Sequence, residues 1–185
     1  MQVAGLGVAL LLATAETAPA SPPEIGREIP GFEATSLDGR PLSFPKVLAG
    51  HKATVIVFLS TVCPYARYFA RHLRELGEAY APRDVLFVGV YSNHWESRDE
   101  VAADARDHAF SFAVVKDEGH RIASLLEAER TPEAYLVDAT GVLRYRGWVE
   151  SQKESPDLQR ALDAVLAGRR VRTAATKAFG CSIDR

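Results

Sequence analysis

The stretch Thr54-Val-Ile-Val-Phe-Leu-Ser-Thr-Val-Cys63-Pro64-Tyr65-Ala66-Arg67 carries one cysteine at the junction of two patterns. Before the cysteine, residues 53–60 form a nearly unbroken apolar run rich in β-branched side chains, which predicts a central strand covered on both faces. After it, Pro64 suits the first position of a helix, because its fixed φ is helical and its missing N–H would have no partner there. A helix N-terminus favours a thiolate and lowers the pKa of a thiol below its ordinary value of about 8.5. The sequence therefore indicates that Cys63 is a reactive cysteine.

The rest of the chain alternates between strand and helix patterns. In the helix predicted after Cys63, the apolar residues share one face, at steps of three or four: Tyr65, Phe69, Leu73, Leu76 and Tyr80. Hairpins are predicted at 32–44 and 133–149, strands at 85–91 and 112–115, and helices at 97–109, 122–128 and 155–166. This order predicts an α/β fold of three layers, with helices on both faces of a mixed central sheet and a hairpin near the N-terminus.

The composition is that of one globular domain. The chain has 185 residues, of which 47 % are hydrophobic and 25 % are charged, and its net charge is −2. Basic and acidic residues are scattered, so we expect no nucleic-acid partner and no polybasic membrane patch. We divide the chain into a predicted signal peptide at 1–20, a linker at 21–30, a domain at 31–168 and a tail at 169–185 that carries Cys181.

The N-terminal segment predicts export. Residues 3–15 are small and apolar, and Ala18-Pro19-Ala20 matches the pattern that precedes a signal-peptidase cut. No Lys or Arg precedes the apolar run, so an uncleaved anchor and an ordinary N-terminal segment are alternatives. We expect a periplasmic or secreted protein, with membrane contact only if the segment stays uncleaved. In an oxidising compartment the two cysteines form either a structural disulfide that closes a long loop or a redox pair.

Three local motifs resemble the thioredoxin superfamily, specifically its redoxin branch of the alkyl hydroperoxide reductase C and thiol-specific antioxidant type. They are residues 57–66 around Cys63, residues 130–141, and Tyr145-Arg-Gly147. The resemblance covers about residues 24–168 and implies a thioredoxin-like fold with Cys63 as the nucleophile. It also implies that a cis peptide bond precedes Pro132, opposite Cys63, and that the Thr131 backbone offers hydrogen bonds to a bound substrate chain.

One position departs from the pattern of dithiol oxidoreductases, which carry Cys-x-x-Cys. Here Ala66 stands where the second cysteine would be, so Cys63 has no local partner. After attack on a disulfide or a peroxide, Cys63 must be released by another thiol. Cys181 is the internal candidate for this resolving role, and an external thiol reductant is the alternative.

A peroxidase centre of this superfamily carries an upstream proline, a Ser or Thr, and an arginine against the thiolate. Ser60 suits the hydroxyl position, but Ile56 replaces the proline, and Arg130 or Arg146 would have to supply the arginine. Tyr65 either shapes access to the thiol or packs. We assign the substrate-binding surroundings of Cys63 to five residues: Ser60, Pro64, Tyr65, Thr131 and Pro132.

The sequence thus predicts an exported thiol oxidoreductase that acts through Cys63 in thiol–disulfide exchange or peroxide reduction. Its partners would be a protein or small-molecule disulfide or a hydroperoxide, together with an external thiol reductant. The five histidines show no close metal-ligand spacing, so we predict no metal and no cofactor. The alternative is a non-catalytic binding module of the same fold, with Cys63 and Cys181 joined in a permanent disulfide.

Overall fold

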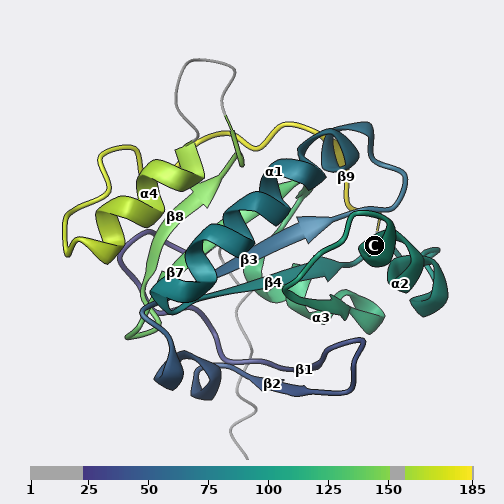
Figure 1. Ribbon diagram of the computed structural model, residues 1–185, viewed down its shortest axis with the longest axis horizontal. Helices are drawn as coiled ribbons and strands as arrows, with labels where there is room; N and C mark the ends of the chain where they lie inside the picture. The colour runs from purple at the N-terminus through teal and green to yellow at the C-terminus, as the bar shows by residue number, and fades with distance from the viewer. Residues whose placement is uncertain (1–22, 151–156, 185) are drawn as a thin grey trace, which may run out of the picture.

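A five-stranded mixed sheet forms the centre of the computed structural model, which describes residues 23–150 and 157–184 (Figure 1). In spatial order its strands are β5 (Ala113–Lys116), β4 (Val85–Tyr91), β3 (Ala53–Leu59), β7 (Glu133–Asp138) and β8 (Leu143–Gly147). The first three run parallel, whereas β7 is antiparallel to both β3 and β8. All seven residues of β3 are buried, as expected for a central strand between two layers. The predicted mixed sheet is confirmed.

Helices cover both faces of this sheet, which confirms the three-layer prediction. One face is covered by α1 (Pro64–Tyr80), α2 (Arg98–Asp107) and α4 (Asp157–Leu166). The other is covered by η1 (Lys46–Gly50), α3 (Arg121–Leu126) and the hairpin of β1 (Glu33–Thr35) and β2 (Pro41–Ser43). Alternate residues of β3 serve the two layers: Val55 and Val57 join the first core, and Ile56 and Phe58 join the second.

The remaining elements are short. They are the turns η2 (Ala81–Arg83) and η3 (Glu118–His120) and the two-residue strands β6 (Arg130–Thr131) and β9 (Cys181–Ser182). The predicted start of the last helix at 155–156 and the predicted signal peptide at 1–20 lie outside the described residues. Among the residues that are described, no helix has the length and apolar character needed to cross a membrane.

The C-terminal segment packs on the domain, a placement that the sequence patterns did not indicate. The division into a domain at 31–168 and a tail at 169–185 separates Cys181 from the core. In the structure β9 pairs with β6 in a small antiparallel sheet of its own. Figure 1 shows the yellow segment passing from α4 to the N-terminal end of α1 and ending beside α2. The expected linker likewise binds the domain, since Gly26 and Ile29 donate backbone hydrogen bonds to Leu143 and Gly141.

Candidate active site

Cys63 lies where the sequence predicts it, between the end of β3 and the start of α1. It is the N-cap residue of α1, with Pro64 at the first helical position. Its side chain is 0 % exposed, and its Sγ donates a hydrogen bond of 2.9 Å to the carbonyl oxygen of Thr131. The thiol therefore lies between the positive end of a helix and the loop that precedes β7.

The peptide bond between Thr131 and Pro132 is cis, which confirms the expectation drawn from the family resemblance. Thr131 ends β6, and Pro132 separates this short strand from β7 in the central sheet. The carbonyl oxygen of Thr131 meets the Cys63 thiol at this point. Of the predicted site residues, Pro64, Thr131 and Pro132 thus lie at Cys63.

Cys181 reaches the same place from the C-terminal segment. In the antiparallel pairing of β6 and β9, Thr131 lies opposite Cys181 and Arg130 lies opposite Ser182. Both cysteines carry free thiols, and Cys181 is partly exposed whereas Cys63 is buried. The structure therefore brings together the two cysteines that the sequence separates.

The two thiols differ in acidity. Burial acts to raise the pKa of Cys63, but hydrogen bonds with the side chains of Cys181 and Thr131 and with the backbone of Ala66 outweigh it, so the pKa lies below its ordinary value. Burial raises the pKa of Cys181 to about 11, and the proximity of Cys63 adds to that rise. Cys63 is thus the thiol that ionises first, as a nucleophile requires.

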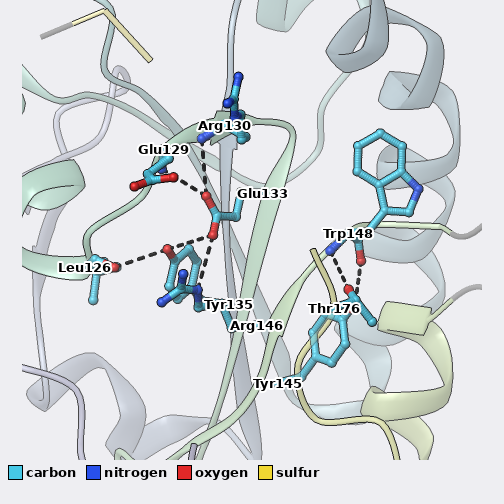
Figure 2. Close-up of polar contacts among 9 residues, drawn as sticks. All are labelled: Leu126, Glu129, Arg130, Glu133, Tyr135, Tyr145, Arg146, Trp148 and Thr176. Carbon is cyan, nitrogen blue, oxygen red and sulfur yellow. Dashed lines mark hydrogen bonds and ion pairs between the residues drawn. The ribbon is translucent and has the colours of Figure 1, made fainter. Parts of the chain in front are cut away.

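A buried carboxylate fixes the loop that carries Thr131. Glu133 is 3 % exposed, and its Oε2 accepts hydrogen bonds from the backbone N–H groups of Glu129 at 3.0 Å and Arg130 at 3.2 Å. Its Oε1 accepts a hydrogen bond from the Tyr135 hydroxyl at 3.1 Å and pairs with Nε of Arg146 at 3.3 Å. Figure 2 shows these contacts converging on Glu133, directly after the cis peptide bond.

A second polar cluster fixes the C-terminal segment to the end of β8 (Figure 2). Oγ1 of Thr176 accepts a hydrogen bond from the backbone of Trp148 at 2.9 Å and lies 2.8 Å from the Tyr145 hydroxyl. Gly147 makes this approach possible, because a Cβ at this residue would lie 2.3 Å from the Thr176 carbonyl oxygen. The segment is thus anchored five residues before Cys181.

The remaining predicted residues, Ser60 and Tyr65, make their hydrogen bond and ring contacts with residues other than the two cysteines. Ser60 is buried, and its hydroxyl accepts a hydrogen bond from the backbone of Val62 at 3.4 Å, within the turn before Cys63. Tyr65 is 40 % exposed and contacts the rings of Trp148 and Phe179. Tyr65 therefore belongs to an aromatic border of the site.

The two candidate arginines bind groups other than the Cys63 sulfur. Arg130 donates to the Ser182 hydroxyl at 2.8 Å and to the Gly180 carbonyl at 3.5 Å, so it holds the C-terminal segment. Arg146 pairs with Glu133. Both guanidinium groups therefore have other partners, and neither forms an ion pair with the Cys63 sulfur.

Sequence patterns missed three residues that shape the site: Glu96, Glu133 and Gly180. Glu96 is buried, and its Oε1 accepts hydrogen bonds from the backbone and the hydroxyl of Thr61, two residues before Cys63. Glu96 lies in a loop and Glu133 in a strand, and a charged residue in such a place is usually solvated. For Glu133 the one available signal was its position directly after Pro132.

The fold and the thiol pair together define a thioredoxin-like thiol oxidoreductase. The AhpC/TSA family matches residues 25–146, and the chain belongs to this family. The matched region includes Cys63 and Pro132 but ends before Cys181. A search of the curated proteins returned no match.

Several solved structures share this fold. A hypothetical protein of Sinorhizobium meliloti is 24 % identical, with a TM-score of 0.80 over 89 % of this chain and 96 % of the other. A conserved protein of Geobacillus kaustophilus is 28 % identical, with a TM-score of 0.80 over 88 % and 92 %. A secreted disulfide oxidoreductase of Mycobacterium tuberculosis, homologous to DsbE of E. coli, is 22 % identical, with a TM-score of 0.58 over 74 % and 95 %.

Replacing Glu133 with glutamine should loosen the loop at Thr131. The amide has one acceptor oxygen, and its NH2 group would face donors that the carboxylate now accepts from. We expect Glu133→Gln to lower the free energy of unfolding by about 1–3 kcal/mol in denaturant titrations. Glu129→Gln, at an exposed neighbouring position, should change it by less than about 0.5 kcal/mol. Equal losses in the two variants would contradict the role given to Glu133.

The acidity of Cys63 should depend on its partner thiol. The pH dependence of Cys63 alkylation, followed by peptide mapping, should have its midpoint below the value of about 8.5 for an ordinary cysteine. Cys181→Ala should move the midpoint upward, because it removes a hydrogen bond that stabilises the thiolate. Cys181→Ser keeps a donor and should move it less. A midpoint that stays in place or falls in Cys181→Ala would refute this origin of the low pKa.

Proposed function

We propose that the protein is an exported thiol–disulfide oxidoreductase in which Cys63 is the nucleophile and Cys181 is the resolving thiol. The observation that carries this proposal is that Thr131 contacts both cysteines. Its carbonyl oxygen accepts the Cys63 hydrogen bond, and its strand pairs it with Cys181. The membership in the AhpC/TSA family supports thiol oxidoreductase chemistry in general.

The reaction would proceed in two exchanges. The Cys63 thiolate attacks one sulfur of a substrate disulfide, forms a mixed disulfide and releases the other sulfur as a thiolate that takes up a proton. Cys181 then loses its proton and attacks the Cys63 sulfur, which forms the Cys63–Cys181 disulfide and releases the second substrate thiol. The substrate gains two electrons and two protons. An external thiol reductant returns both cysteines to the reduced state.

The first exchange would itself activate the second thiol. The proximity of Cys63 contributes to the raised pKa of Cys181. Once Cys63 is part of a mixed disulfide it carries no negative charge, so this contribution disappears and the pKa of Cys181 falls. Cys181 therefore becomes a better nucleophile at the step where it is needed.

Disulfide exchange has more support in the site than peroxide reduction. Arg130 and Arg146, the two arginines considered for a peroxidase centre, bind the C-terminal segment and Glu133. Ile56 occupies the place of the upstream proline and belongs to the second core cluster. Disulfide exchange needs only the acidic Cys63 thiol and a second thiol within reach.

Single-cysteine variants test this function. We expect Cys63→Ser to lose at least about 99 % of the disulfide reductase activity, because a hydroxyl at its ordinary pKa is a poor nucleophile. Cys181→Ser should retain the first exchange and accumulate a mixed disulfide on Cys63, detected by mass spectrometry. Peroxide consumption measured in parallel should be much slower than disulfide reduction in the wild-type protein.

Two results would contradict the proposal. Full activity in Cys63→Ser would show that Cys63 is not the nucleophile. A Cys63–Cys181 bond in the native protein that resists mild reductant until unfolding would favour a non-catalytic binding module with a permanent disulfide.

Export is part of this proposal and rests on residues 1–20. Their apolar run and the Ala18-Pro19-Ala20 pattern predict cleavage. The similar disulfide oxidoreductase of Mycobacterium tuberculosis is described as secreted. N-terminal sequencing of the protein from the exported fraction should give a mature chain that begins at Ser21. Recovery in the cytoplasm with residues 1–20 intact would contradict export.

A further inference from the structure

The C-terminal segment crosses the candidate active site as an ordered strand. Beyond β9, the Ile183 backbone donates a hydrogen bond of 2.9 Å to the Glu129 carbonyl, and the Ile183 side chain is buried in the second core cluster. The Asp184 backbone donates one of 2.9 Å to Oδ1 of Asn93. With the anchor at Thr176, the segment is held on both sides of Cys181.

The fit of this segment against β6 depends on a glycine. Gly180 has a φ of +151°, and a Cβ at this residue would lie 2.1 Å from the Thr131 carbonyl oxygen. This is closer than atoms that are not bonded can approach, so a side chain at residue 180 cannot coexist with the observed pairing. Gly180 thus permits a backbone-to-backbone contact directly over the residue that binds Cys63.

The pairing occupies the edge that a polypeptide substrate would use. Extended chains bind sheets by adding a strand, with their backbone groups paired to those of the exposed edge. At β6, Cys181 and Ser182 already take the positions opposite Thr131 and Arg130. Cys63, beneath them, is 0 % exposed. A substrate chain would therefore have to displace the whole segment before it could pair with Thr131.

We propose that the docked C-terminal strand makes low-molecular-weight disulfides the substrates of Cys63 and excludes polypeptide disulfides. This inference rests on the proposed function and names the substrate class of the same site. A small disulfide has no extended backbone to pair with β6, so its reaction with Cys63 does not require another chain to replace the pairing of β6 with β9. Phe179 is 59 % exposed and borders the site through Tyr65.

The test compares the first exchange on two disulfides in full-length variants that share Cys181→Ser, so that the mixed disulfide on Cys63 accumulates. In this step a Cys63–sulfur bond forms, the substrate S–S bond breaks, and one thiolate leaves. The probes are oxidised glutathione and insulin, followed by acid quench and mass spectrometry. Gly180→Ala is added to lift the strand. Gly168→Ala is the matched control, because Gly168 also has a positive φ but has open space around it.

We expect Gly180→Ala to raise the ratio of the insulin rate to the glutathione rate at least about tenfold, because an undocked minor state is populated at about 10 % or less in the parent. Gly168→Ala should leave this ratio unchanged. Hydrogen exchange at the backbone amide of residue 183 reports whether the strand has undocked. Ile183→Asp, which removes a buried anchor, is the second opening variant.

An unchanged rate ratio in a variant whose backbone amide at residue 183 has lost protection would overturn the inference. Protection that persists in both opening variants would overturn it as well, because the strand would then not depend on these contacts. Either result leaves the proposed function intact, provided that Cys63 forms the mixed disulfide. Failure to form it with both oxidised glutathione and insulin in the Cys181→Ser parent would instead refute the proposed function.

Discussion

The backbone of Thr131 is the point on which both thiols depend. Its carbonyl oxygen accepts a hydrogen bond from Cys63, and its strand position places Cys181 opposite. Glu133 fixes this loop from the side of the central sheet, and Gly180 allows the C-terminal strand to approach from the other side. A shift of this short loop would therefore move the two sulfur atoms relative to each other.

The site separates the two thiols by acidity as well as by exposure. Cys63 is buried yet acidic, because hydrogen bonds at the start of α1 and from its partner favour the thiolate. Cys181 is partly exposed, and its pKa is raised to about 11. Since the lower pKa belongs to the better leaving group, an external thiol that attacks the Cys63–Cys181 disulfide at Cys181 would release Cys63.

The sequence predicted the elements that depend on local pattern. The apolar run of β3, the stripe of α1 and the position of Cys63 between them follow from periodicity and from Pro64. The cis bond before Pro132 followed only from family resemblance. The docking of Cys181 could not be predicted, because it depends on long-range backbone pairing and on a close approach of the backbone at Gly180 to Thr131. The burial of Glu133 could not be predicted from its residue type, because most glutamate side chains are exposed to solvent.

The hydrogen bond between Cys63 and Thr131 spans 68 residues of sequence. The contact with Cys181 that helps to lower the pKa of Cys63 also comes from a distant segment, so the acidic thiol exists only after the central sheet, the loop and the C-terminal strand have assembled. An unfolded chain carries two ordinary thiols of nearly equal acidity. The reactivity of Cys63 is therefore a property of the completed fold, and a nascent or damaged chain is spared an activated thiol that could join it to other proteins.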